Sequence, residues 1–256
     1  MIRFRRTRIK LRILYARLTR QPRTELRRHQ FNFWAENGWV EGLDAVHLPL
    51  MEQALLRMSL SPRDRILDLA CGGGLASRMV ADTVGERSRV VGIDISDIMV
   101  RRARAKSKQF KNLDFMCCSA DQIPLPDDYF SHILCVEAFY YFEDPEKVLH
   151  ELLRVAAPLA ELSLVLCLYK DYAPSLLTAD SVDVPIQARS AAEYKQLLES
   201  TGWKDVQCED YLREAEPGRK PDFHDRALFI TARKPTSSPA RILTPVDTSA
   251  TSSPRE

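Results

Sequence analysis

The sequence lacks any apolar run of the roughly 18–20 residues that a membrane-spanning helix requires. Residues 1–28 also lack the continuous apolar core of a secretory signal. Their many arginines are similar to those of an organelle transit peptide, but such peptides are usually rich in serine, and the first serine here is Ser59. We therefore expect a cytoplasmic protein.

Cysteine is present, but never in the paired spacing of a metal or redox motif. The six cysteines form no Cys-x-x-Cys pair, and nothing in the sequence indicates an oxidising compartment. We expect buried, reduced thiols and predict neither a disulfide framework nor a metal site. The six are Cys71, Cys117, Cys118, Cys135, Cys167 and Cys208.

Charge is distributed unevenly along the chain. Residues 1–28 hold ten Arg and one Lys against the single acid Glu25, which gives +10, so the other 228 residues carry −8 of a formal total of +2. The acidic body argues against extended nucleic-acid binding. In the basic arm, arginines are interleaved with apolar residues such as Phe4 and Leu11. This pattern predicts either peripheral contact with an anionic membrane or a disordered extension.

Composition divides the chain into four regions. A basic arm over 1–28 is followed by a helical cap over 29–60, with a break expected near Pro49. An α/β domain is expected over 61–234. Residues 235–256 hold 4 Pro, 5 Ser and 4 Thr, which leaves too little apolar surface to offset the entropy of ordering. This last region is therefore predicted to be a disordered tail.

Apolar runs alternate with helical patterns through the α/β domain. This alternation predicts a Rossmann-like α/β fold, in which a mostly parallel seven-stranded sheet has helices on both faces and an antiparallel last strand. The expected strands are residues 65–70, 89–94, 113–117, 132–136, 162–168, 205–209 and 227–232, and the expected helices are 75–84, 96–108, 144–155 and 191–201.

A glycine-rich turn follows the first expected strand, in the segment Asp68-Leu-Ala-Cys-Gly-Gly-Gly74. Glycines allow the left-handed backbone of a tight turn and let a ligand approach the main chain. The dinucleotide pattern G-x-G-x-x-G is not satisfied, because its third glycine, counted from Gly72, falls on Ser77. Asp68 is a poor neighbour for a pyrophosphate, but it suits the ammonium and sulfonium groups of S-adenosylmethionine.

A second acid, Asp94, ends the next expected strand, 22 residues after Gly72. An acid about 20 residues beyond the glycine turn can accept hydrogen bonds from both hydroxyls of a cofactor ribose. The competing interpretation is a helix-terminal acid beside the capping residue Ser96. The glycine turn at this distance favours the ribose interpretation.

With these residues in place, the stretch from Arg65 to Val155 resembles the class I S-adenosylmethionine-dependent methyltransferases. It is most similar to the small-molecule group that includes the ubiquinone and menaquinone C-methyltransferases (methyltransferase type 11). Their first motif is D-x-G-x-G-x-G, and Ala70 stands here in place of its first glycine. We expect this replacement to be mild if the backbone angles of Ala70 suit alanine.

The resemblance also implies an adenine-binding loop at residues 119–121, where the family often has an acid, Ala and Glu. Two further departures are Ser131, where the family usually has Asp, and the loss of a Lys-Pro-Gly-Gly turn before the fifth strand. The cofactor-binding residues implied by these motifs are Asp68, Ala70, Cys71, Gly72, Gly74, Asp94, Ile95, Ser119, Ala120 and Asp121.

Three candidate catalytic residues, Glu137, Tyr140 and Tyr141, follow the fourth expected strand. The carboxyl ends of parallel strands face the ligand crevice, so these side chains are expected near the acceptor. Glu137 is interpreted either as a base or orienting group or as a solvated loop acid, and the tyrosines either as a pocket wall or as packing. His47 is a further candidate, with a structural role as its alternative.

The predicted function is in-line methyl transfer from S-adenosylmethionine to a small organic acceptor, which would be lipid-soluble if the basic arm contacts a membrane. The chain lacks the Asn/Asp-Pro-Pro-aromatic tetrapeptide of DNA amino-methyltransferases after the fourth strand. One alternative is a non-catalytic cofactor-binding protein, which the motif departures at Ala70, Ser119 and Ser131 leave open. Another is a nicotinamide-dependent oxidoreductase, which the failed dinucleotide pattern disfavours.

Overall fold

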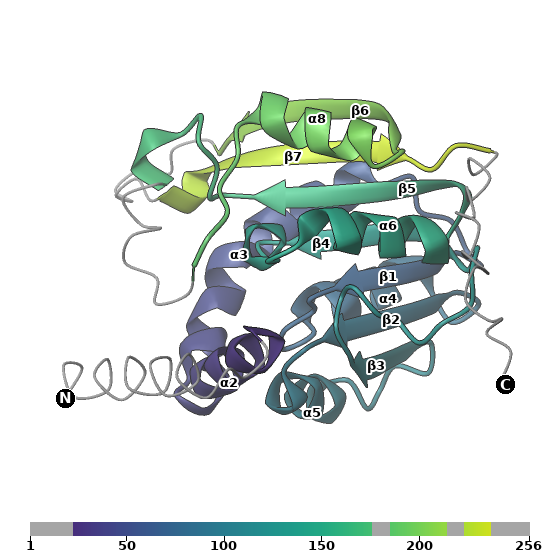
Figure 1. Ribbon diagram of the computed structural model, residues 1–256. Coiled ribbons are helices and arrows are strands. Elements are labelled where there is room, and N and C mark those ends of the chain that lie inside the picture. The colour runs from purple at the N-terminus through teal and green to yellow at the C-terminus, as the bar shows by residue number, and fades with distance from the viewer. Residues whose placement is uncertain (1–22, 176–184, 214–222, 237–256) are drawn as a thin grey trace, which may run out of the picture.

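A computed structural model describes residues 23–175, 185–213 and 223–236 of the chain. Its centre is a seven-stranded sheet with the order β3-β2-β1-β4-β5-β7-β6 (Figure 1). Strands β1 to β5 run parallel, and β7 lies antiparallel between β5 and β6. The strands are β1 Arg65–Leu69, β2 Arg89–Asp94, β3 Leu113–Cys117, β4 Phe130–Val136, β5 Ala156–Leu166, β6 Lys204–Leu212 and β7 Arg226–Arg233.

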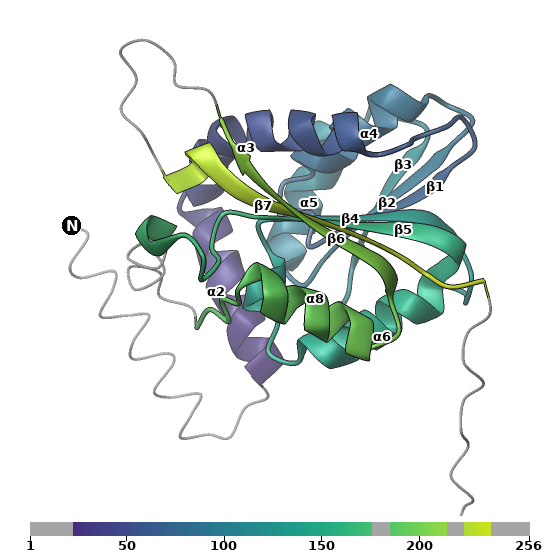
Figure 2. The ribbon, with the colours of Figure 1, turned by 90° about the horizontal axis from the view of Figure 1, so that it is seen from above.

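Helices cover both faces of this sheet. Figure 2 shows α3 and α4 on one side and α6 and α8 on the other. Ser96, Asp144 and Ser190 cap the first turns of α5, α6 and α8 with their side chains, as residues of these types favour. The helices are α2 Arg23–Glu36, α3 Trp39–Arg57, α4 Leu75–Val84, α5 Asp97–Lys106, α6 Pro145–Val155 and α8 Ala191–Ser200, with short 3₁₀ helices η1 Phe139–Tyr141 and η2 Phe223–Asp225.

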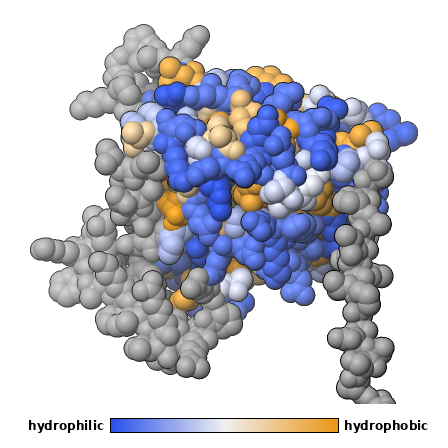
Figure 3. Space-filling model, turned by 45° about the horizontal axis from the view of Figure 1, so that its top comes forward, coloured by the Kyte–Doolittle hydropathy of each residue, from blue (hydrophilic) through white to orange (hydrophobic). Residues whose placement is uncertain are grey.

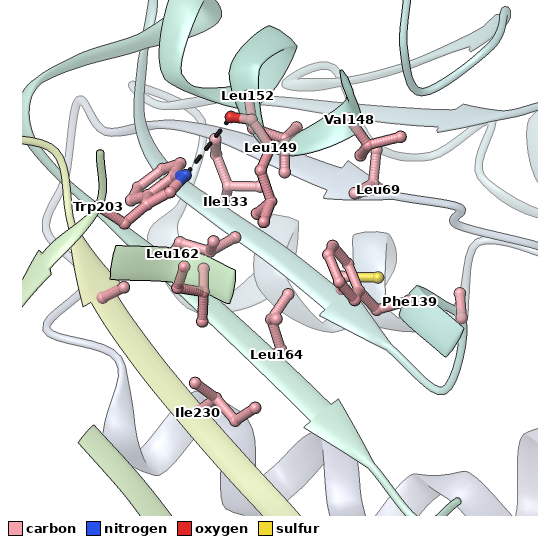
Figure 4. Close-up of a cluster of buried hydrophobic side chains, with 14 of the residues drawn as sticks. Leu69, Ile133, Phe139, Val148, Leu149, Leu152, Leu162, Leu164, Trp203 and Ile230 are labelled. Atoms are coloured by element: carbon pink, nitrogen blue, oxygen red, sulfur yellow. Dashed lines mark hydrogen bonds between the residues drawn. The ribbon is translucent and has the colours of Figure 1, made fainter. Parts of the chain in front are cut away.

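The larger part of the hydrophobic core lies between the sheet and the helices α6 and α8. Leu149 and Leu152 of α6 pack there against Ile133 of β4 (Figure 4). Trp203 is fully buried in the same cluster, and its indole N–H donates to the backbone oxygen of Leu149 at 3.4 Å. Long apolar strands such as β5 are therefore buried on both faces, as expected for a parallel sheet.

The sheet and its helices confirm the predicted Rossmann-like fold. The prediction for the N-terminal helices was wrong in one respect, because Pro49 lies inside α3 and the break falls at Gly38. Gly38 has a φ of 74°, a left-handed angle that glycine adopts without a steric penalty, so the chain turns there. Helix α2 begins at Arg23, within the predicted basic arm, and then packs against α5.

Two of the predicted regions fall largely outside the described residues, namely the arm before residue 23 and the tail after residue 236. No helix within the described ranges is long and apolar enough to cross a membrane. On the face in Figure 3, hydrophilic side chains dominate and apolar ones are scattered in small groups.

Candidate functional site

The glycine turn joins the end of β1 to the start of α4. Gly74 has a φ of 75°, and a Cβ there would come within 2.8 Å of the Phe115 ring and 2.9 Å of Ala103. Gly72 has a φ of 52°, but a Cβ there would meet nothing within 4 Å. Gly74 is therefore required by close packing, whereas a Cβ at Gly72 would point into open space.

Ala70 is the one strained residue of this turn. Its φ is 57°, in the left-handed region, where the Cβ of an L-residue is crowded at a cost of about 1 kcal/mol relative to glycine. The expectation of a mild replacement depended on angles that suit alanine, and these angles do not suit it. The turn thus has at Ala70 a backbone angle that glycine adopts more easily than alanine.

Asp94 is buried at the carboxyl end of β2 and is held by two backbone amides. Its Oδ2 accepts from the N–H of Gly72 at 2.9 Å, and its Oδ1 accepts from the N–H of Ser96 at 2.8 Å. Burial raises the pKa of this carboxyl to about 6, although the amides oppose the shift. Asp94 thus connects the glycine turn to the start of α5, and both oxygens keep lone pairs for a ligand.

Asp68 lies behind the glycine turn. Its carboxylate accepts a hydrogen bond from the Ser77 hydroxyl in the first turns of α4, and the side chain is only 2% exposed. Burial, opposed by that hydrogen bond, raises its pKa to about 7. The sequence predicted this carboxylate beside the ligand, whereas in the structure it faces Ser77 of α4 and does not line the cavity.

The loop after β3 carries the three residues of the implied adenine site. The Ser119 hydroxyl donates to Asp121 Oδ1, and Lys147 of α6 donates to Asp121 Oδ2 at 2.7 Å. The Asp121 carboxylate is therefore already engaged on both oxygens. This arrangement ties the loop to α6 and leaves Ala120 between its two polar neighbours.

One cavity of about 760 Å³ runs along the carboxyl ends of β1, β2 and β4. Asp68 and Gly74 do not line it. Its lining includes two groups of residues: the turn and loop residues Ala70, Cys71, Gly72, Asp94, Ile95, Ser119, Ala120 and Asp121, and the residues Phe31, Trp34, His47, Glu137, Tyr140, Tyr141 and His224 from other segments. We call these the turn end and the aromatic end.

Glu137 occupies the aromatic end directly after β4. Its φ is 55°, and its side chain is 8% exposed, so it is not a solvated loop acid. Its Oε1 accepts from the backbone N–H of Cys167, and its Oε2 accepts from the Tyr140 hydroxyl at 3.0 Å. Burial raises the pKa of this carboxyl to about 7, with the hydrogen bonds opposing the shift.

Aromatic rings from separate segments form the wall beside Glu137. The Tyr141 ring lies edge-on to Phe31 at 5.4 Å and to Trp34 at 6.1 Å, and these two α2 rings are 5.3 Å apart. Sequence analysis missed Phe31 and Trp34, because the apolar residues of α2 are too few to mark one face. Because α2 is rich in basic residues, its sequence does not indicate that these two side chains line the cavity.

Two histidines complete the aromatic end. His47 of α3 and His224 of η2 have ring centres 5.3 Å apart. Burial, followed by the facing His224, lowers the pKa of His47 to about 4, so its ring is neutral at pH 7. His224 was missed by sequence analysis, since no local pattern surrounds it.

Ser131 is remote from the cavity. It lies at the amino end of β4, where its hydroxyl accepts from the Arg65 N–H and donates to Asp64 Oδ1, each at 3.1 Å. Glu137 follows the opposite end of the same strand. The replacement of the family Asp by Ser131 therefore affects strand pairing and not the candidate site.

Comparison with known proteins places this fold among methyltransferases. Residues 67–164 match the model of a methyltransferase domain family. A 2-phytyl-1,4-naphtoquinone methyltransferase of Synechococcus elongatus is 31% identical over 146 residues, which are 53% of this chain and 62% of the relative. A demethylmenaquinone methyltransferase of Lysinibacillus sphaericus is 27% identical over 44% of this chain and 48% of its own length. The chain thus spans about half to three fifths of these relatives.

Solved structures of methyltransferases share this fold. A chain from the complex between the Haloferax volcanii Trm112 methyltransferase activator and a methyltransferase aligns with a TM-score of 0.71 and 26% identity, covering 80% of this chain and 98% of that one. Human N-acetylserotonin methyltransferase, solved with S-adenosylmethionine, has the same fold at a TM-score of 0.62 and 18% identity, covering 77% and 55%. The family match over residues 67–164 and the shared fold agree with the sequence prediction of a class I methyltransferase domain of the small-molecule type.

Proposed function

We propose that this chain transfers a methyl group from S-adenosylmethionine to a small, largely apolar organic acceptor. The observation that carries the proposal is one continuous cavity of about 760 Å³, which is lined by both the turn end and the aromatic end. A transfer enzyme must hold donor and acceptor in one enclosure with the reacting atoms in line. The family match and the methyltransferase relatives support this function over an oxidoreductase.

The cofactor belongs at the turn end. In this proposal Ala70, Cys71 and Gly72 present backbone to the methionine part of the cofactor. Asp94 accepts from the ribose hydroxyls with the lone pairs that its two amide partners leave free. Ile95 and residues 119–121 surround the adenine. Asp68 and Gly74 act as positioning residues, because they hold α4 and the turn from behind.

The acceptor belongs at the aromatic end. The rings of Phe31, Trp34 and Tyr141 offer apolar, edge-on surfaces that suit a flat ring system. Glu137 is the carboxylate among them and would bind and orient an acceptor hydroxyl, while Tyr140 holds Glu137 in place. A lipid-soluble acceptor of quinol type has both features, and two of the relatives bear quinone substrates in their names.

Methyl transfer does not require a covalent intermediate with the protein. The carbon–sulfur bond of the sulfonium breaks with its electron pair going to sulfur, while an electron pair of the acceptor forms the new bond to the methyl carbon. The proton that the acceptor loses passes to solvent or to a nearby base. The chain's task is to align the two ligands and to exclude water from the cavity.

A panel assay tests the proposal. The full chain is incubated with S-adenosylmethionine and hydroquinones, phenols or amines, and S-adenosylhomocysteine is measured. We expect turnover with hydroquinones or phenols, and none with Asp94→Ala. Cofactor binding without turnover on any acceptor would support the non-catalytic alternative. Absence of cofactor binding would exclude both the enzyme and the non-catalytic cofactor-binding protein.

Peripheral membrane contact through the basic arm stays a prediction, since most of that arm lies outside the described residues. Co-sedimentation with anionic vesicles would test it on the full chain. Replacing Arg3, Arg5, Arg6 and Arg8 with Gln should release the protein from the vesicles, and unchanged binding would refute the prediction.

A further inference from the structure

Three side chains of metal-ligand type meet at the aromatic end of the cavity. His47 belongs to α3, Glu137 follows β4 and His224 belongs to η2. One nitrogen from each imidazole and one oxygen of the carboxylate lie within 4.8 Å of one another. All three side chains line the cavity, so a bound ion would face the space assigned to the acceptor.

The distance between the two imidazole rings matches the distance expected for two histidines that share an ion. For tetrahedral zinc, a metal–nitrogen bond of about 2.1 Å and about 1.2 Å from nitrogen to ring centre put two ring centres about 5.4 Å apart. The observed separation of His47 and His224 is 5.3 Å, with the ring planes inclined by 58°. The ring separation is thus compatible with two imidazoles that share one ion.

The surroundings of the cluster orient its carboxylate. Glu137 Oε2 accepts from Tyr140 and Oε1 from the Cys167 amide, which fixes the plane of the carboxylate and leaves a lone pair on each oxygen. Hydrogen bonds of this kind hold metal ligands in place in known sites. Within the described part of the chain, no hydrogen bond engages the His47 ring, which leaves its nitrogens available.

We propose that His47, Glu137 and His224 form a three-ligand site for a divalent transition metal of zinc type, with an open position toward the cavity. Two nitrogens and one carboxylate oxygen suit zinc and its first-row neighbours better than Mg²⁺ or Ca²⁺, which prefer oxygen ligands. Three protein ligands with one open position are typical of a catalytic rather than a structural site. The prediction of no metal considered cysteine spacing and did not consider residues so distant in sequence.

The role of the ion rests on the proposed function. The open position would take a hydroxyl oxygen of the acceptor, and a bound cation lowers the pKa of such a hydroxyl. The acceptor would then lose its proton to solvent near neutral pH and present an electron-rich oxygen or ring to the methyl group. Metal binding itself requires only the three ligands.

Cobalt(II) is the probe for the test, because its visible absorption reports the number and type of its ligands. The full chain is freed of metal with a chelator and titrated with Co²⁺, then with Zn²⁺ as a competitor. We expect one equivalent of Co²⁺ with a four- or five-coordinate spectrum. His47→Ala, His224→Ala and Glu137→Gln should each weaken binding on the order of 100-fold.

His150→Ala is the matched control, since His150 is exposed on α6, away from the cluster. This variant should bind Co²⁺ as the parent does. Absence of Co²⁺ binding by the parent, or binding that survives His47→Ala and His224→Ala through the cysteines, would overturn the proposal. Calorimetry with S-adenosylmethionine on the same variants distinguishes failure of the metal-site proposal from failure of the methyltransferase proposal. A protein that binds the cofactor but no metal would contradict only the metal site.

Discussion

The two ends of the cavity are built from different parts of the chain. The turn end consists of residues that follow β1, β2 and β3 in order, and its carboxylate Asp94 is held by backbone amides. The aromatic end collects Trp34, Glu137 and His224 from α2, the end of β4 and η2. In the proposed function, recognition of the cofactor would therefore reside in short local motifs, whereas recognition of the acceptor would depend on tertiary contacts between distant segments.

Glu137→Gln is expected to give the largest difference between the functions of the two ends. This change keeps the side-chain shape but removes the charge from the aromatic end, so we expect kcat to fall about 100-fold or more. Affinity for S-adenosylmethionine should stay unchanged, because Glu137 does not belong to the turn end. Steady-state kinetics and calorimetry on the same preparation measure both. Equal loss of cofactor affinity would show that the ends are not independent.

A stability measurement tests the buried acid behind the turn. The pKa of Asp68 rises on folding from 3.8 to about 7, so the folded state binds more protons and loses stability as pH rises between these values. Asp68→Asn removes this loss, and the variant should be more stable than the parent at pH 8, by as much as roughly 4 kcal/mol. The difference should vanish near pH 4.

Urea unfolding at a series of pH values provides the comparison for Asp68→Asn. Asp82→Asn is its control, since Asp82 is exposed on α4, the helix whose Ser77 donates a hydrogen bond to Asp68. A parent whose stability does not decline between pH 4 and pH 7 relative to Asp68→Asn would contradict the burial argument.

A smaller effect is expected from Trp34→Ala. Trp34 provides one ring of the aromatic end, and its loss should raise KM for the acceptor about tenfold while cofactor affinity stays constant. Trp34→Phe should recover most of the affinity because a ring remains. A rise in KM for S-adenosylmethionine with either variant would place the acceptor wall elsewhere.

The smallest expected effect is the change in stability caused by a substitution in the glycine turn. Ala70→Gly relieves the left-handed strain and should stabilise the fold by about 0.5–1 kcal/mol after the added freedom of the unfolded chain is counted. Ala105→Gly is the opposite control, because Ala105 lies exposed in helix α5, where glycine costs about 1 kcal/mol. Thermal unfolding of the two variants should shift in opposite directions, and a shift of both in one direction would refute the strain.

The same contrast explains what the sequence allowed us to predict. Strand β2 and helix α4 were predicted to the residue, because apolar runs and glycines signal local structure. Pro49 was misjudged as a break, because tertiary packing keeps α3 helical through it. Phe31 and His224 could not be found, since no periodicity or motif connects them to Glu137 before the chain folds.

Titration calorimetry with S-adenosylmethionine tests the central claim most directly. The parent should bind one equivalent, and Asp94→Ala should bind on the order of 100-fold more weakly, because hydrogen bonds from two ribose hydroxyls to a carboxylate are lost. Glu137→Gln should bind as the parent does. Cofactor affinity of Asp94→Ala equal to that of the parent would contradict the assignment of the turn end.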